Sequence, residues 1–213
     1  MFLDGLVKKK IYQANIYSSH ILPRYIDHLK KKKAPRVLDL GYISGKNIEF
    51  LAKLGFTVYV EDYLNSISWE ELQPRILPRR KKTKKKLLEV KNLNYTQDYF
   101  DGILCWDLFD YLDFEDGKWL IKEIWKILKP EGVAFSLFDS YKSSLYQSHR
   151  KKIFIYDENH LFYDRVPFIR TFFTTYENRD IFALFAEFNI LESYYVKNGM
   201  REILIQKRLS YPK

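Results

Sequence analysis

The residues that could do chemistry in this sequence begin with the stretch VLDLGYISGKN, residues 37–47. An apolar run ends in Asp39, a turn containing Gly41 and Gly45 follows, and a helix is predicted to begin there. The dinucleotide-binding spacing G-x-G-x-x-G is absent, because Ile43 stands where such loops place their middle glycine. An acid that faces the loop would repel a pyrophosphate, but it would attract a cofactor that carries an ammonium and a sulfonium group.

A second pair of acids, Glu61 and Asp62, follows the next apolar run, Phe56–Val60. Consecutive residues of a strand point to opposite sides, so only one of these two acids can face the glycine turn. Together with Asp39, an acid in that position favours S-adenosylmethionine over a dinucleotide as the bound cofactor.

The elements that must position these residues alternate between strands and helices from residue 36 onward. Short, fully apolar strands are typical of a parallel sheet covered by helices on both faces. The turn signal Asn198-Gly199 predicts that the last two strands form an antiparallel hairpin. The expected strands are Arg36–Leu40, Phe56–Val60, Leu87–Val90, Gly102–Trp106, Val133–Phe138, Ile190–Val196 and Glu202–Gln206. The expected helices are Lys46–Leu54, Ser66–Leu72, Lys118–Leu128 and Asn178–Phe188.

The segment before the first strand, residues 1–33, is expected to be helical. An apolar stripe at helical spacing supports this, with an interruption near Pro23. The stripe consists of Ile11, Ile16, Ile21, Tyr25 and Leu29. A chain of 213 residues suits one domain, and no Gly- or Ser-rich linker divides it, so residues 1–213 are expected to form a single domain.

The composition narrows the class of protein. Hydrophobic residues make up 46% of the chain, yet no run of about 18 apolar residues indicates a membrane span. The single cysteine, Cys105, excludes an internal disulfide and a zinc site built from cysteines. A chain with one cysteine fits a reducing compartment, so we expect a cytoplasmic protein without a bound metal. The sequence does not indicate an oligomeric state.

The net charge of +9 comes largely from lysine clusters, above all the block RRKKTKKK at Arg79–Lys86. Such a block can hold the phosphates of RNA. A solvated, lysine-rich surface is the simpler interpretation, because no RNA-binding motif accompanies the charge.

Several motifs together resemble the class I S-adenosylmethionine-dependent methyltransferases, over about residues 34–207. The family's first motif, a strand ending in an acid before a glycine loop, is matched by VLDLGYISGKN. The second and third motifs are similar to GFTVYVEDY and LLEVKNLNYTQDYFD. The fourth strand resembles FDGILCWDLFDYL, and the turn and strand after it resemble LKPEGVAFSLF. Each motif alone is weak, whereas their order and spacing are specific.

The resemblance implies a Rossmann-like methyltransferase fold, with a mostly parallel seven-stranded sheet, helices on both faces and a C-terminal antiparallel hairpin. It also implies roles for residues that follow the strands. Asp62 would bind the ribose hydroxyls, Tyr63 would lie against adenine, and Glu89 would accept from the adenine amino group. Trp106 and Asp107 would lie where the methionine portion of the cofactor meets the acceptor.

The acceptor is expected beneath a covering segment after the fifth strand, residues 139–176. Its interleaved arginines and aromatic residues would suit a planar or anionic acceptor. Asp107 and His160 are the candidates for a general base, should the acceptor lose a proton. The fourth strand is not followed by the Asn/Asp-Pro-Pro-Tyr/Phe motif of the methyltransferases that act on the amino groups of DNA bases.

The predicted function is therefore transfer of a methyl group from S-adenosylmethionine to a small-molecule acceptor. A methyltransferase acting on RNA is the first alternative, because of the basic block. A catalytically inactive methyltransferase-like binding protein is the second, because Ile43 adds bulk to the cofactor loop. We expect Ile43 to keep an ordinary φ and to turn its side chain into the core.

Overall fold

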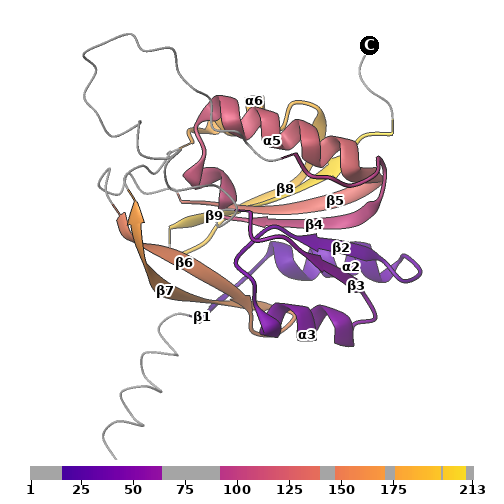
Figure 1. The fold of residues 1–213 in the computed structure, drawn as a ribbon, viewed down its shortest axis with the longest axis horizontal. Helices are drawn as coiled ribbons and strands as arrows, with labels where there is room; N and C mark the ends of the chain where they lie inside the picture. Colours follow the sequence, from indigo (N-terminus) through magenta and orange to yellow (C-terminus); the bar gives the residue numbers. More distant parts are fainter. Residues whose placement is uncertain (1–15, 64–91, 140–146, 171–175, 198, 210–213) are drawn as a thin grey trace, which may run out of the picture.

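The computed structural model describes residues 16–63, 92–139, 147–170, 176–197 and 199–209 (Figure 1). At its centre is a six-stranded sheet in the order β3-β2-β4-β5-β9-β8. The first four strands of this order run parallel, whereas β9 is antiparallel to both of its neighbours. This confirms the predicted α/β architecture. The strands are β2 (Arg36–Asp39), β3 (Thr57–Val60), β4 (Phe100–Trp106), β5 (Leu128–Asp139), β8 (Phe188–Tyr195) and β9 (Met200–Lys207).

Several predicted features lie outside the described residues. They are the helix Ser66–Leu72, the basic block Arg79–Lys86 and the strand Leu87–Val90, which contains Glu89. Six of the seven predicted strands are therefore described.

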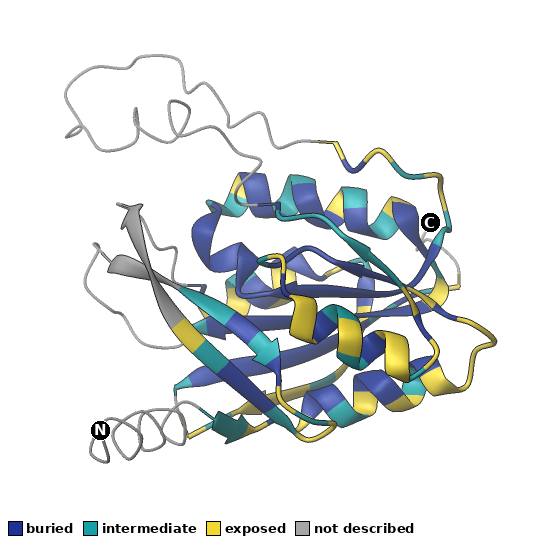
Figure 2. Cartoon of the chain, turned by 60° about the horizontal axis from the view of Figure 1, so that its bottom comes forward, coloured by how far each residue is buried: buried dark blue, intermediate teal, exposed yellow. Residues whose placement is uncertain are grey.

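Helices cover both faces of the sheet (Figure 1). On one face lie α2 (Ile21–Lys30) and α3 (Gly45–Lys53), and on the other lie α5 (Phe114–Ile127) and α6 (Asn178–Leu184). Alternation along β2 sends Val37 into the core beneath α2 and Leu38 into the core beneath α5. Figure 2 shows the buried strands between helices whose outer faces are exposed. The sheet thus holds the ends of its strands in a fixed arrangement.

A second, three-stranded antiparallel sheet has the order β1-β7-β6. The prediction that residues 1–33 are helical is wrong at β1 (Ile16–Ser18), which pairs with β7 (His160–Arg170). The third strand is β6 (Gln147–Ile155), which forms a hairpin with β7. Ile16 fits a helical stripe in sequence, but its strand partner Phe162 is far away along the chain, so local spacing could not indicate the pairing.

The C-terminal hairpin has the predicted turn. Val196 donates its backbone N–H to Met200, and Gly199 donates to Val196, each at 2.9 Å. Gly199 has a φ of +80°, a conformation that glycine adopts without steric cost. Asn198 lies outside the described residues.

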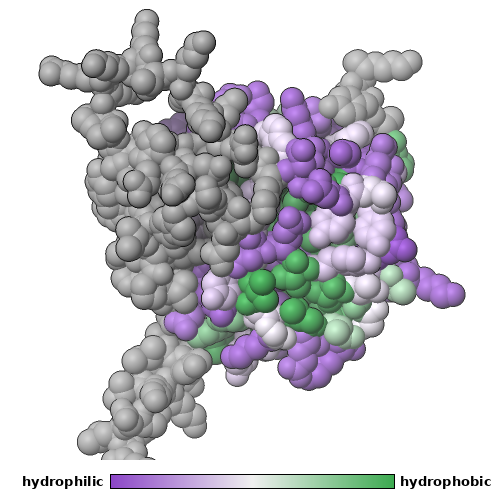
Figure 3. All heavy atoms as spheres, in the orientation of Figure 1, coloured by the Kyte–Doolittle hydropathy of each residue, from purple (hydrophilic) through white to green (hydrophobic). Residues whose placement is uncertain are grey.

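The described surface in Figure 3 is largely hydrophilic, with a smaller apolar area among the charged and polar residues. Among the described residues, no helix is both long and apolar enough to cross a membrane.

Candidate active site

The turn after β2 is held by Asp39, whose side chain is almost completely buried. Its Oδ1 accepts the backbone N–H of Gly41 at 2.9 Å and the indole N–H of Trp106 at 2.7 Å. Its Oδ2 accepts from the side-chain amide of Asn47 at 3.4 Å. Burial raises the pKa of Asp39, and these hydrogen bonds only partly counteract that rise. Asp39 therefore ties β2, the turn, α3 and β4 together.

Gly41 is required by the close approach of Trp106. A Cβ at this position would collide with the indole ring, with the indole nitrogen only 2.7 Å away. Trp106 is 3% exposed and has a φ of +50°, in the left-handed region that costs most residues about 1–2 kcal/mol. The β4–β5 register also shifts between Leu104 and Trp106. Such irregularities re-aim a side chain next to a site, and here the indole becomes the floor of the glycine turn.

Ile43 does not turn into the core, which corrects the expectation from sequence. Ile43 is 56% exposed, while Ser44 after it and Gly41 two positions before it are buried. Its φ is not positive, as expected. The turn positions Ile43 at its tip because Ser44 caps α3, accepting the backbone N–H of Asn47 at 3.5 Å. Ile43 thus adds bulk at the rim of the turn.

The end of β3 carries its two acids to opposite sides. The backbone N–H of Glu61 donates to Asp39 at 2.8 Å, so the chain continues alongside the turn. Glu61 hydrogen-bonds the hydroxyl of Tyr95, whose pKa is raised by burial and by this acid. Asp62 is partly buried and lies close enough to Asp39 for its charge to contribute to the raised pKa of that carboxyl. Asp62 is therefore the acid on the side of the turn.

Two of the predicted adenine contacts receive no support. The side chain of Tyr63 is completely buried in the core that α5 covers, and this burial raises the pKa of its hydroxyl far above the ordinary value. Its ring leaves no surface for adenine. Glu89 is outside the described residues.

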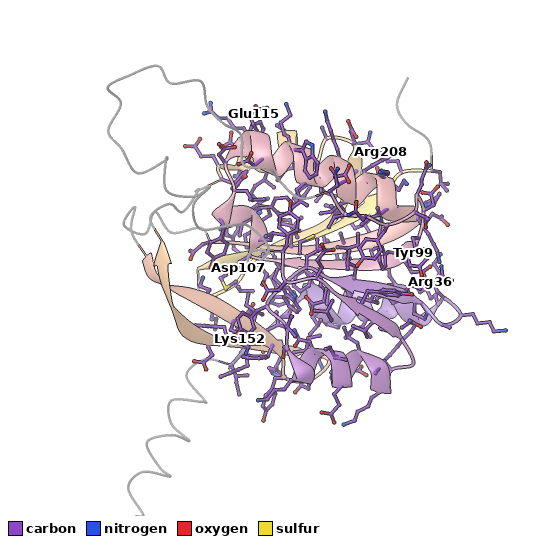
Figure 4. All side chains as sticks on the ribbon, in the orientation of Figure 1. Arg36, Tyr99, Asp107, Glu115, Lys152 and Arg208 are labelled. Atoms are coloured by element: carbon purple, nitrogen blue, oxygen red, sulfur yellow. The ribbon has the colours of Figure 1, made fainter. Side chains whose placement is uncertain are left out.

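Three aspartates meet at the carboxyl ends of β4 and β5. Asp107 follows β4 directly and accepts from the hydroxyl of Tyr111 at 3.3 Å. Asp110 lies in the short 3-10 helix η2 (Leu108–Tyr111), and its Oδ2 accepts the backbone N–H of Asp139 at 2.9 Å. Lys151 of β6 donates to Asp139 at 2.9 Å. We call Asp107, Asp110, Asp139 and Lys151 the aspartate cluster. Figure 4 labels Asp107 on the side of the sheet where the β6–β7 hairpin lies.

The charges in the aspartate cluster influence one another. Burial and the charge of Asp107 raise the pKa of Asp110 well above its ordinary value. Burial alone would lower the pKa of Lys151, but the nearby charges of Asp139 and Asp107 outweigh it and raise that pKa. Lys151 therefore stays protonated and compensates part of the negative charge.

Side-chain hydrogen bonds hold the β6–β7 hairpin at two places, to β5 of the main sheet and to α3. On one side Lys151 binds Asp139. On the other, the side-chain amide of Asn47 donates to the carbonyl of Ile153 at 3.3 Å and accepts the N–H of Ile155 at 2.8 Å. Asn47 thus occupies the open edge of β6 as another strand would. Apart from the position of Asn47 in the first turn of a predicted helix, nothing in the sequence indicated this contact.

The structure does not bring His160 to the strand ends. It is the first residue of β7, in register with Ser18 of β1. Its imidazole is within 2.8 Å of Asp157 in the turn of its own hairpin. Leu161 next to it points into the core, so His160 points to the opposite face of the small sheet. Of the two base candidates, Asp107 alone lies in the aspartate cluster.

A parallel sheet with a buried acid, a glycine turn and further acids at the strand ends defines an α/β protein that binds a nucleotide-like cofactor. The family model described as methyltransferase domain matches residues 13–189, which is most of the chain. The chain therefore belongs to the methyltransferase domain family. It is an enzyme of the methyltransferase class, and its cofactor is S-adenosylmethionine.

Solved structures with low sequence identity share the fold. A S-adenosylmethionine-dependent methyltransferase from Clostridium acetobutylicum is 18% identical, with a TM-score of 0.56 and coverage of 96% of this chain and 97% of that one. A methyltransferase from Methanosarcina mazei is 17% identical, with a TM-score of 0.52 and coverage of 87% and 98%. The 1,6-didemethyltoxoflavin-N1-methyltransferase of Burkholderia thailandensis is 14% identical, with a TM-score of 0.50 and coverage of 97% and 85%. No curated protein sequence matches the chain.

The residues present fit this cofactor at the edge of the turn. Asp62 offers a partly exposed carboxylate beside it, and a Cβ at Gly45 would meet no atom within 4 Å, so the helix start is open. Asp39, in contrast, is fully engaged in shaping the turn. The predicted contacts of Asp62, Gly41, Gly45 and Trp106 with the cofactor stay predictions.

Proposed function

We propose that this enzyme transfers the methyl group of S-adenosylmethionine to a small-molecule acceptor held at the carboxyl ends of β4 and β5, beneath the β6–β7 hairpin. The observation that carries this proposal is the aspartate cluster. It adjoins Trp106, the residue that packs on the cofactor turn, and Lys151 of the hairpin is part of it. The N1-methyltransferase of similar fold has 1,6-didemethyltoxoflavin and S-adenosylhomocysteine bound, which supports a small molecule as the acceptor here as well.

Each group of residues has a defined task in this proposal. When bound, the cofactor supplies a methyl group activated by its positive sulfur. Asp62 accepts hydrogen bonds from the ribose hydroxyls, and the backbone of the turn orients the remainder. Asp107 receives a proton where the acceptor has one to lose. The hairpin shields the reacting atoms from water and fixes their alignment, which is most of what an in-line displacement requires.

The two alternatives have less support. RNA as acceptor would bring phosphates toward several buried carboxylates, which repel them. The basic block that motivated RNA lies outside the described residues. An inactive binding protein was suggested by Ile43, whose exposed side chain leaves the floor of the turn to Gly41 and Trp106.

Thermal unfolding with S-adenosylhomocysteine tests the cofactor part of this proposal. A ligand at 100 times its Kd stabilises the folded state by about 2.7 kcal/mol, which gives a clear rise in Tm. NAD is the matched control, since it shares the adenosine but adds a pyrophosphate. A Tm that rises with NAD and not with S-adenosylhomocysteine would refute the proposal.

A further inference from the structure

Lys152 of β6 is a half-buried lysine whose ammonium group contacts two aromatic rings. The ammonium nitrogen lies 3.9 Å from the centroid of the Tyr42 ring and 5.3 Å from the centroid of the Phe154 ring. Among the described residues no carboxylate forms an ion pair with it, and this includes Asp164, which is opposite Lys152 in the register of the hairpin. The charge of Lys152 is therefore available to a ligand.

This ammonium group lies over the turn of the cofactor site. Tyr42, whose ring it contacts, directly follows Gly41 in that turn. Asn47 of α3 donates its side-chain amide to the carbonyl of Ile153 at 3.3 Å, so the part of β6 that contains Lys152 is held beside the turn. Figure 4 labels Lys152 on the hairpin, near the start of α3. Lys152 is thus fixed next to the cofactor turn, although 110 residues separate it from Tyr42 in the sequence.

The hairpin reaches the turn from the side opposite to Asp62. In the order of the main sheet, Asp62 follows β3, on one side of β2. Lys151 anchors the hairpin to Asp139 at the end of β5, on the other side of β2. A cofactor whose ribose binds Asp62 therefore extends its methionine portion along the turn toward β4 and the hairpin.

The methionine portion of S-adenosylmethionine carries a carboxylate as well as an ammonium group. Asp39 and Asp62 favour the positive groups of the cofactor, but they repel its carboxylate, which needs a cation of its own. Two lysines of the described chain lie beside the turn. Lys46 is exposed on α3, with its ammonium 5.5 Å from the Phe154 ring. Lys152 is less exposed and contacts the turn itself through Tyr42.

We infer that Lys152 binds the carboxylate of S-adenosylmethionine and that Tyr42 positions its ammonium group. An ammonium has three N–H donors, so it can rest on the face of a ring and still donate to a carboxylate. The inference rests on the proposed function, because it names a further binding residue for the same cofactor. It also gives a task to Tyr42, a large residue in a turn built around two glycines.

Two ligands that differ only in the carboxylate test this inference. S-adenosylhomocysteine and its decarboxylated analogue are titrated calorimetrically into the full chain and its variants. Lys152→Gln should weaken S-adenosylhomocysteine about tenfold or more, because a hydrogen bond between charged groups is lost, and should leave the analogue within about threefold. Lys152→Arg should keep the preference for the carboxylate. Lys46→Gln, the matched control on the same Phe154 ring, should change neither affinity by more than about threefold.

The role of Tyr42 is tested with the same two ligands. Tyr42→Leu removes the ring beneath the ammonium and should reduce the preference for S-adenosylhomocysteine over its analogue. Tyr42→Phe keeps the ring and should retain that preference. Each variant should bind the analogue as the wild type does, which shows that it is folded.

The outcomes separate the inference from the proposed function. A wild-type chain that binds neither ligand would refute the proposed function, whereas equal affinity for both ligands would overturn this inference alone. Equal loss of both ligands in Lys152→Gln at the wild-type Tm would mean that Lys152 only holds the hairpin. A selective loss in Lys46→Gln alone would transfer the role to Lys46. If Lys152→Gln has a much lower Tm, the two Tyr42 variants decide, and an unchanged preference in both would overturn the inference.

Discussion

At the scale of single residues, the acids of the site divide into those that build the turn and those that can still reach a ligand. Asp39 has the position of a cofactor ligand in sequence, but its two oxygens accept three hydrogen bonds from the protein. Asp62 is only partly buried beside the same turn. Sequence spacing indicated both acids equally well. It could not separate them, because the difference depends on Trp106, which is distant along the chain.

Replacement of Asp62 should reduce cofactor affinity much more than replacement of Glu61. A hydrogen bond to a charged acceptor contributes about 1.5–3 kcal/mol, so Asp62→Ala should weaken binding of S-adenosylhomocysteine at least tenfold. Glu61→Ala removes a bond to Tyr95 and should change the affinity by less than about threefold. Calorimetric titration of both variants measures the difference. Equal losses would show that the strand register is misassigned.

Gly41 and Gly45 should respond differently to one added methyl group. Gly41→Ala forces a Cβ against Trp106, and overpacking of this kind costs about 1–3 kcal/mol. Gly45→Ala meets no atom within 4 Å at the start of α3 and should change stability by less than about 0.5 kcal/mol. Urea unfolding of both variants measures this. Similar stabilities would mean that the indole moves aside easily.

Asp110 should make the folded protein less stable as pH rises. Its pKa is raised in the folded state above the ordinary value of 3.8, mainly by burial, so the folded chain holds this proton more tightly than the unfolded chain. Stability is then lost from about pH 4 upward, through the folded pKa. Asp110→Asn should therefore be more stable than the wild type at pH 7, because the amide cannot ionise and its oxygen can still accept from Asp139. Urea titrations at several pH values should show this advantage disappearing near pH 4, and an advantage that is constant with pH would contradict the assignment.

At the scale of elements, the least predictable part is the small sheet over the strand ends. The sequence indicated that residues 139–176 cover the acceptor, and the β6–β7 hairpin lies within that range. Its strands were not predicted. One reason is that β7 pairs with the distant β1 as well as with β6, and local spacing does not indicate such a pairing. The parallel strands and the helices of the main sheet were predictable, because their apolar spacing is a local property.

Asn47 should hold the hairpin against α3. Asn47→Ala leaves the carbonyl of Ile153 and the N–H of Ile155 without partners, which should cost roughly 1–3 kcal/mol. Amide hydrogen exchange should show loss of protection at Ile155 well before the strands of the main sheet. Asn159→Ala, in the exposed turn of the hairpin, should leave protection at Ile155 intact. Unchanged exchange in Asn47→Ala would mean that the hairpin is held by its core contacts alone.

At the scale of the whole molecule, the fold could be predicted and the acceptor could not. The order of the motifs indicated a methyltransferase, and the family match agrees. The aspartate cluster was hidden, because Asp107 and Asp110 look like surface residues near a turn until β5 and β6 bring Asp139 and Lys151 beside them. A site assembled from separate elements leaves no spacing in sequence by which to recognise it.

The positive charge of the molecule should affect nonspecific binding and leave catalysis intact. Replacing Lys81, Lys82, Lys84 and Lys85 by Gln removes four of the charges that produce the net +9. Affinity for RNA should fall, along with its dependence on salt, because fewer counterions are released on binding. Filter binding at two salt concentrations and a methyl transfer assay measure the two effects. Loss of methyl transfer in a folded variant would make RNA the acceptor.

The bond between Asn47 and β6 also has a consequence for the order of folding. Asn47 and Ile155 are 108 residues apart in the sequence, so their contact closes a very long loop. The entropy of that closure is lost before the contact contributes anything, which favours its formation late, on a main sheet that already exists. A contact absent from the transition state affects the unfolding rate and leaves the refolding rate nearly unchanged. The side chain of Asn47 would then influence the unfolding rate, and so the lifetime of the folded enzyme, with little influence on the folding rate.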